Sequence, residues 1–311
     1  MSAVSPATSR PLDRLRRNAS DLVGLFVLPM VAAALPWSLG YRLLGRLARR
    51  SAVFRPEADA AWLVARRYLP AAEEHAWKRR YRLLRWVERA DTYLTLSRSA
   101  RWWQRRIDVE GQWPAPDGAI LFLTFHWGAG HWVWKSLRAH GVPAYFLARR
   151  PVVGDLGVSR VALWYGSLRA WAFSRIGSLG PLYTGGSSAR IRAALGAGEN
   201  VVGMLDLPAG SAQRPLDVEL FGRPARLPSR LAQIARSEAA RVAVFSCGFD
   251  FATGRRRLRI EALPAQLDEA SLLQRYADHL SACLLSAPEC WMMWHEAPAI
   301  FRAEDADAAD A

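Results

Sequence analysis

Residues 120–131 read ILFLTFHWGAGH, and the fold class follows from them. Ile120 to Phe125 is a short, uninterrupted apolar run, which is typical of a strand buried on both faces. The preceding segment 111–118, GQWPAPDG, contains the Gly and Pro residues of a turn, and 132–140 has the pattern of a helix. A buried strand that leads directly into a helix is the first unit of an α/β domain.

The same alternation of strand and helix continues towards the C-terminus. Further strands are predicted at 144–147, 201–205, 241–247 and 257–261, and further helices at 158–173, 189–195, 229–236 and 269–285. Parallel strands are joined by crossover connections, which are usually helices. We therefore expect an α/β fold with a mixed, largely parallel sheet flanked by helices.

Composition divides the chain into four expected segments. The 311 residues are 51% hydrophobic and 23% charged, which excludes a disordered or fibrous protein. Three cysteines are too few for a disulfide framework, and an odd number cannot all be paired. The expected segments are a basic N-terminal part with a membrane anchor (1–50), a helical part rich in Arg and Trp (51–110), the α/β domain (111–302) and a disordered acidic tail (303–311).

The N-terminal part predicts attachment to a membrane. Residues 22–41 contain no charge, and these 20 residues have about the length of a helix that spans a bilayer. Pro29, Pro36 and the arginines on both sides leave three alternatives open: a spanning helix, an anchor in the membrane interface, and a cleaved signal peptide.

Positive charge is concentrated in the first third of the chain. The net charge is +14; residues 1–110 carry 21 basic and 10 acidic residues, whereas the remaining 201 carry 21 and 18. Such a surface suits nucleic acid, anionic lipid headgroups or an acidic carrier protein. The adjoining apolar segment favours a membrane over nucleic acid. A second basic run, 255–259, is predicted to be solvated on a hairpin turn.

A candidate site follows the first strand, because open α/β sheets bind ligands at the carboxyl ends of their strands. The six residues there run from His126 to His131, with Gly128 and Gly130 between them. A histidine with a pKa near 6.5 is largely neutral at pH 7 and can act as a base. The glycines let the backbone approach a substrate, and amides at the start of the next helix could face a developing oxyanion.

Several other segments follow this hexad in a fixed order. They are Arg150-Pro151, Arg175 in SRIGSLG, Asp206 in GENVVGMLDLP, Leu220-Phe221-Gly222, and APECWMMWHEAPAIF at 287–301. Together they resemble the bacterial lipid A biosynthesis acyltransferases, the lauroyl and myristoyl transferases, within the glycerolipid acyltransferases that use an His-x4-Asp/Glu motif. The resemblance covers about 119–302.

The resemblance implies a membrane-associated acyltransferase on the cytoplasmic face of the bacterial inner membrane. It would move a fatty acyl chain from acyl carrier protein or coenzyme A to a hydroxyl or amine of a lipid-like acceptor, without a metal or redox cofactor. His126 corresponds to the general base, Asp206 to the functional aspartate, and Arg175 to an arginine that contacts substrate. Arg149 and Arg150 either bind a phosphate of acceptor or carrier or form a solvated edge.

The chain departs from the family at the acid of its motif, where His131 stands in place of Glu or Asp. Three alternatives follow: Asp206 or Asp155 supplies the carboxylate, the pair of His126 and His131 works with less charge support, or catalysis is lost. A metal bound by the two histidines is disfavoured because no third ligand is evident. The competing hypothesis is a non-catalytic membrane-associated protein that binds an acyl chain or a partner enzyme.

Overall fold

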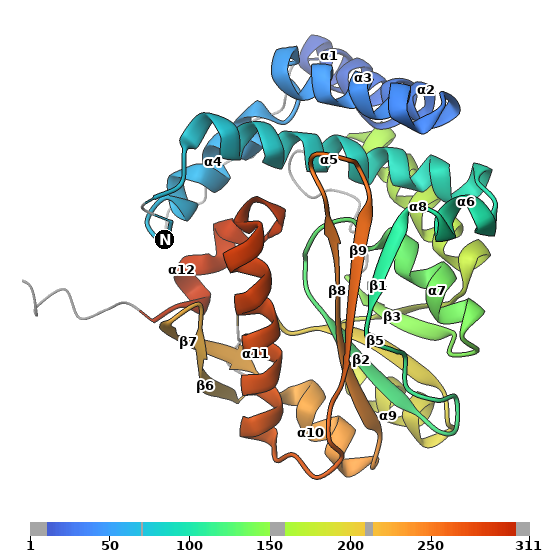
Figure 1. Ribbon diagram of the computed structural model, residues 1–311, viewed down its shortest axis with the longest axis vertical. Coiled ribbons are helices and arrows are strands. Elements are labelled where there is room, and N and C mark those ends of the chain that lie inside the picture. The colour runs from blue at the N-terminus through green and yellow to red at the C-terminus, as the bar shows by residue number, and fades with distance from the viewer. Residues whose placement is uncertain (1–10, 70, 150–158, 209–213, 303–311) are drawn as a thin grey trace, which may run out of the picture.

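The computed structural model describes residues 11–69, 71–149, 159–208 and 214–302 (Figure 1). Within these ranges the core is a seven-stranded sheet in the order β1-β9-β8-β2-β5-β3-β4. Its strands are β1 (Ile107–Glu110), β2 (Ile120–Thr124), β3 (Ala144–Ala148), β4 (Ser178–Tyr183), β5 (Asn200–Met204), β8 (Arg241–Phe249) and β9 (Arg256–Ala262).

All neighbouring strands of this sheet are parallel except β8 and β9, which are antiparallel. All five residues of β2 are buried because β2 lies between β8 and β5 and is covered on both faces. A strand of this kind reads as a continuous apolar run. The expected mixed, largely parallel α/β sheet is confirmed.

Helices cover both faces of the sheet. Phe122 packs with α7 (Val133–Ala139) and with Ile176 at the end of α8 (Arg160–Ile176). Leu121 and Leu123 belong to the opposite core, with residues of α9 (Ser187–Gly196), α10 (Arg230–Ser237) and α11 (Glu269–Ser286). The alternation of side chains along β2 therefore divides the interior into two cores.

The N-terminal helices stack above the carboxyl edge of the sheet (Figure 1). They are α1 (Pro11–Asp21), the π-helix η1 (Leu22–Val27), α2 (Leu28–Ala34), α3 (Trp37–Arg50) and α4 (Arg55–Ala65). The 24-residue helix α5 (Glu74–Ser97) contacts α2, α3 and α4 on one side. On its other side it contacts η2 (Gly130–Trp132) and η3 (Pro288–Cys290), so it joins the N-terminal helices to the sheet.

The uncharged run 22–41 does not form a single helix. The helix ends at Ala34, Leu35 has an extended ψ of 160°, and α3 begins after Pro36. Proline disfavours the helical conformation in the residue before it. The Arg98 guanidinium donates to the carbonyl oxygens of Ala33 and Leu35 and so satisfies the end of α2. The continuous helical segment Leu15–Ala34 is long and apolar enough for a membrane anchor or signal.

The prediction of a solvated basic run at 255–259 is wrong for Arg256. Strand β9 begins there, and Arg256, Leu258 and Ile260 point inward while Arg257 and Arg259 point outward. The fully buried Arg256 guanidinium donates to Asp91 of α5 over 2.5 Å and lies 4.3 Å from the centre of the Trp132 ring. A buried pair of opposite charges thus connects α5 to the sheet.

The sequence patterns missed four short strands and the short helices at the end of the chain. Strands β1 and β4 lie at the two edges of the sheet, and β6 (Pro215–Leu220) and β7 (Arg223–Pro228) form a separate antiparallel hairpin. Strands β4, β6 and β7 contain prolines, and these prolines hide the strand pattern in the sequence. Proline is tolerated there because each of the three is an edge strand. The remaining short helices are α6 (Ala100–Gln104), η4 (Trp294–Glu296) and α12 (Ala297–Ile300).

Candidate active site

His126 and Asp206 meet because two adjacent parallel strands end at the same level. Thr124, the last residue of β2, is in register with Met204, the last residue of β5. His126 and Asp206 each lie two residues beyond this pair, so both leave the sheet at its carboxyl edge.

The two side chains form a closely bonded pair. The backbone N–H of His126 donates to Asp206 Oδ2 over 2.8 Å, and Nδ1 of the ring lies 3.0 Å from Oδ1. Trp291 Nε1 donates to Oδ2 over 3.0 Å. Asp206 is fully buried, whereas the His126 side chain is 33% exposed. Because Nδ1 donates its hydrogen to the carboxylate, the other ring nitrogen, Nε2, is left as the basic atom.

The surroundings raise the pKa of His126 above its ordinary value of 6.5. Burial acts to lower this pKa, but the negative charge of Asp206, its hydrogen bond to the ring, and the more distant Glu88 outweigh that effect. The carboxylate therefore stabilises the imidazolium that forms when Nε2 accepts a proton. This arrangement is the one required of a general base.

Two structural supports hold the strand ends together. The Tyr276 hydroxyl donates to the carbonyl oxygen of Thr124 over 2.9 Å and accepts from the backbone N–H of Leu205 over 3.0 Å. The backbone N–H of Met292 donates to the carbonyl oxygen of His126 over 2.8 Å. The segment after η3 therefore fixes the backbone of His126.

The turn after His126 is closed by the neighbouring strand. Gly128 has φ +64°, and a Cβ there would lie 2.2 Å from the carbonyl oxygen of Cys247. Its N–H donates to the Cys290 carbonyl, and the N–H of Ala129 donates to the Cys247 carbonyl. Gly128 therefore approaches β8 closely and also lines the cavity described below, while the N–H groups of Gly128 and Ala129 are already used. Gly130 is exposed and lines the cavity described below.

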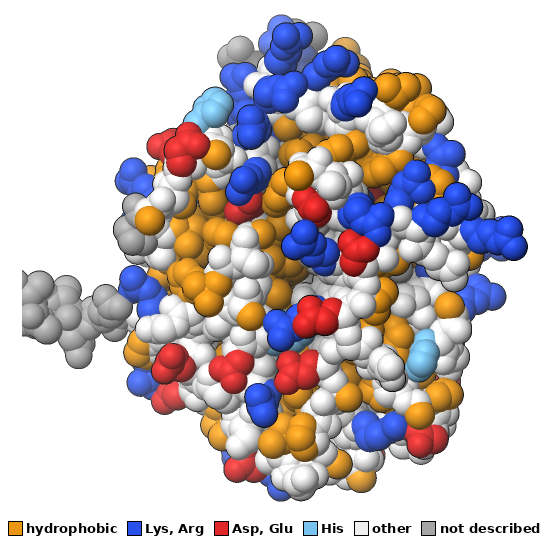
Figure 2. Space-filling view, viewed as in Figure 1, with side chains coloured by type: hydrophobic (Ala, Val, Ile, Leu, Met, Phe, Trp, Pro, Cys, Tyr) orange, Lys and Arg blue, Asp and Glu red, His pale blue; other side chains and the backbone are white. Residues whose placement is uncertain are grey.

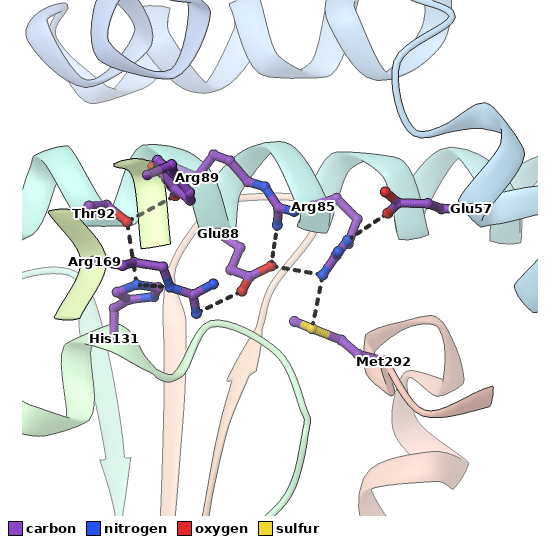
Figure 3. Close-up of polar contacts among 9 residues, drawn as sticks. Glu57, Arg85, Glu88, Arg89, Thr92, His131, Arg169 and Met292 are labelled. Carbon is purple, nitrogen blue, oxygen red and sulfur yellow. Dashed lines mark hydrogen bonds and ion pairs between the residues drawn. The ribbon is translucent and has the colours of Figure 1, made fainter. Parts of the chain in front are cut away.

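His131 faces a different set of groups (Figure 3). Its Nε2 accepts a hydrogen bond from Arg169 Nε of α8 over 3.1 Å and lies 3.4 Å from the Thr92 hydroxyl of α5. Its ring stacks on Phe173, with 4.8 Å between ring centres. Arginine is always a donor, so Nε2 of His131 carries no hydrogen and Nδ1 carries the proton of the neutral ring.

Charge explains why His131 stays neutral. Burial and the positive charge of Arg169 lower the pKa of His131 well below 6.5, although Glu88 acts in the opposite direction. His131 therefore neither pairs with His126 nor supplies a countercharge to it. Of the three alternatives that the sequence left open, the contacts of His126 correspond to the one in which Asp206 is the carboxylate.

Glu88 of α5 is the centre of a buried charge cluster. It accepts from Arg85 over 3.0 Å and from Arg89 over 2.6 Å, and it lies 2.9 Å from Arg169 Nη2. Burial alone would raise the pKa of Glu88, but Arg169, Arg89 and Arg85 together hold it well below its ordinary value. Glu88 is therefore ionised, and the three arginines with Glu88 and His131 form the Glu88 cluster (Figure 3).

A cavity of about 190 Å³ connects the two histidines. His126, His131, Glu88 and Arg169 line its polar side. The rest of its wall is apolar and is formed by side chains from both strands and helices. These include Phe146, Val202 and Phe245 from the sheet and Trp134 and Phe173 from α7 and α8. The cavity is smaller than the roughly 300–1,000 Å³ of pockets that enclose whole ligands, so it suits one end of an apolar ligand.

The other residues expected at the site lie elsewhere. Arg175 is exposed at the end of α8 and lies over the Trp171 ring, in a separate groove with Arg138. Arg149 is exposed directly after β3. Arg150 and Asp155 lie outside the described residues. Neither Arg149 nor Arg175 lines the cavity that contains His126.

No protein-family model and no curated protein matches the chain. Among the residues with described positions, no group of three or more His, Cys, Asp or Glu side chains could hold a metal ion. The interpretation of the site therefore rests on its geometry.

Three residues of the site were not found from the sequence. Trp291 lies inside the C-terminal segment that carried the resemblance, but only contact with Asp206 distinguishes it from neighbouring tryptophans. Glu88 stands three residues after Arg85 on one helix, a spacing from which an ion pair between the two side chains could have been predicted. Arg169 lies in a helix with several other basic residues, and no pattern marks it.

Proposed function

We propose that the protein is a membrane-associated acyltransferase that moves a fatty acyl chain from a thioester to a hydroxyl group of a lipid-like acceptor. One observation carries this proposal: a histidine bonded to a buried carboxylate lines a largely apolar cavity. A base next to an apolar slot suits a reaction between a polar nucleophile and a long hydrocarbon chain.

The reaction follows from these positions. His126 Nε2 takes the proton of the acceptor hydroxyl while its oxygen attacks the thioester carbonyl carbon, and Asp206 stabilises the resulting imidazolium. The carbonyl π electrons move to oxygen and form a tetrahedral oxyanion. When the C–O double bond re-forms, the C–S bond breaks, and the imidazolium returns its proton to the departing thiolate. The products are an ester and a free thiol.

The N-terminal helices support a membrane location for this reaction. Large apolar side chains of η1 and α2 are exposed, among them Leu22, Val27 and Met30, and Trp164 of α8 is also exposed. The helix α8 contacts η1, so the elements that carry these side chains are neighbours. Apolar surface lies beside Lys and Arg side chains over the N-terminal helices (Figure 2). Such a surface can insert into the headgroup region of an anionic membrane.

Acyl transfer by the purified full-length protein tests the proposal. The protein in detergent micelles is incubated with a radiolabelled acyl carrier protein thioester or acyl-coenzyme A and a bacterial lipid extract. We expect a labelled lipid product, and His126→Ala should abolish it. Label transfer that is equal in the wild type and His126→Ala would contradict the role of His126.

A surface histidine provides the matched control. His140, at the end of α7, is exposed and lies outside the cavity, so His140→Ala should retain the transfer rate. If the wild type binds acyl chains but transfers none to any acceptor class of the extract, the non-catalytic binding protein becomes the better description.

A further inference from the structure

Arg169 is held rigidly at the polar side of the cavity. Its Nε donates to His131 over 3.1 Å, and its Nη2 lies 2.9 Å from Glu88. An arginine has five N–H donors, and these contacts use two of them. The side chain is 33% exposed and lines the same cavity as His126. The remaining donors therefore lie next to the cavity in a fixed, planar arrangement.

The Glu88 cluster contains more positive than negative charge. Glu88 is the carboxylate shared by Arg85, Arg89 and Arg169. Among the residues that the structure describes, only Arg85 has a further acidic partner, Glu57. His131 contributes a hydrogen-bond acceptor without a negative charge. A buried site with an excess of cations favours an anion or an oxygen that becomes negative.

Two backbone donors near His126 are already used. The N–H groups of Gly128 and Ala129, which an oxyanion would otherwise meet first, donate to the carbonyls of Cys290 and Cys247. Arg169 is the arginine that lines the cavity within the part of the chain with described positions.

We propose that Arg169 binds the acyl carbonyl oxygen in the cavity, and that His131 and Glu88 are positioning residues that orient its guanidinium. The ligand is an aliphatic chain whose terminal oxygen carries full or developing negative charge: a fatty carboxylate, or the oxyanion formed from an acyl thioester. The thioester case rests on the proposed acyltransferase function. The apolar wall with Phe146, Val202 and Phe245 receives the chain.

This assignment gives the replacement of the motif acid a physical reason. A carboxylate at position 131 would lie against Arg169, beside the carboxylate of Glu88. Two carboxylates would neutralise the guanidinium and repel an anionic oxygen. A neutral imidazole fixes Nε of Arg169 and leaves its charge for the ligand.

Ligand binding tests the site without any turnover. The wild type and variants are titrated with decanoate and with decanol, which have the same chain length, and the fluorescence of the cavity tryptophans Trp127 and Trp134 reports binding. We expect the wild type to prefer decanoate, and Arg169→Met to lower decanoate affinity about 10- to 100-fold while decanol affinity changes little. Arg160→Met, an exposed arginine at the start of the same helix, should keep the preference.

Three further variants keep the test valid if Arg169→Met fails to fold. Arg169→Lys retains a cation for Glu88 but lacks the planar fork, so decanoate affinity should fall. His131→Glu should also lower it, whereas His131→Gln, which keeps a neutral acceptor, should preserve most of it. Equal decanoate affinity in the wild type, Arg169→Lys and His131→Glu would overturn the assignment, as would a wild type that binds neither ligand.

Kinetics separate this inference from the proposed function. If the enzyme transfers acyl chains, Arg169→Lys should lower kcat more than it raises KM, because the contact strengthens as the oxyanion forms. Transfer with kcat unchanged in Arg169→Lys would overturn the oxyanion role while the acyltransferase stands. A decanoate preference that depends on Arg169, without transfer in the wild type, would remove the acyltransferase and leave the binding site.

Discussion

Two histidines five positions apart in one turn have opposite environments. His126 is partly exposed and bonded to the carboxylate of Asp206, and its pKa is raised. His131 is buried and bonded to the guanidinium of Arg169, and its pKa is lowered. The first is therefore the more basic ring, whereas the second stays neutral and accepts a hydrogen bond.

The difference arises from the neighbours that each ring meets in space. His126 faces the end of β5, where an aspartate leaves the sheet, and His131 faces α5 and α8, which together supply three arginines and one glutamate. His126 and Arg169 line one cavity, and the proposals above assign them separate tasks: proton transfer at His126 and binding of negative charge at Arg169. Four predictions test this separation.

Loss of the carboxylate at the His126 end should have the greatest consequence. In Asp206→Asn the amide cannot stabilise the imidazolium, so we expect acyl transfer to fall by about 10³–10⁴-fold and the pKa of His126 to fall. Initial rates and imidazole NMR titration measure the two effects. The paired variant His131→Gln should leave the pKa of His126 almost unchanged. If the Asp206→Asn enzyme kept the transfer rate of the wild type, proton transfer at His126 would not depend on the Asp206 carboxylate.

Loss of the Glu88 carboxylate, at the Arg169 end of the cavity, should mainly lower the stability of the protein. Glu88→Gln leaves Arg85, Arg89 and Arg169 without their shared buried anion, and we expect the free energy of unfolding to fall by about 3–5 kcal/mol. Urea denaturation measures this change. Glu57→Gln removes an exposed partner of Arg85 and should cost no more than about 1 kcal/mol. Similar costs for both variants would contradict a buried cluster.

An alanine substitution should disturb the turn between the two histidines at Gly128 but not at Gly130. Gly128→Ala introduces a Cβ 2.2 Å from the Cys247 carbonyl at φ +64°, and should cost about 1–3 kcal/mol. At Gly130 no atom lies within 4 Å of an added Cβ, so Gly130→Ala should change stability by about 0.5 kcal/mol or less. Thermal denaturation compares the stability of the two variants. An equal loss of stability in both would show that glycine is not specially required at position 128.

The pH dependence should reveal the two imidazoles separately. By ¹H–¹⁵N NMR, His126 should titrate above 6.5 and His131 well below it. Acyl transfer requires neutral His126, so the rate should rise as pH increases through the raised pKa. The stability that the charged His126–Asp206 pair contributes is present below 6.5 and is lost as pH rises through the same pKa. A His126 that titrates below 6.5 would contradict the electrostatic role of Asp206.

Much of the fold was predictable because it depends on local patterns. The apolar run at β2 indicated a strand buried on both faces, and the strand that precedes Asp206 and the helices around it were found in the same way. Edge strands such as β4, with its internal proline, have no such pattern. Arg256 was misinterpreted because a basic run in sequence hides the alternation that buries every second side chain.

Sequence was enough to indicate an α/β sheet with a histidine at the carboxyl end of a central strand, because periodicity and turn residues are properties of neighbouring positions. Sequence placed Asp206 near that histidine only through a resemblance, and it left the partner of His131 open. The parallel register of β2 and β5 joined His126 to Asp206, and the packing of α5 and α8 joined His131 to Arg169. Proton affinity depends on burial and on charges a few ångströms away, and folding brings these together from distant parts of the chain.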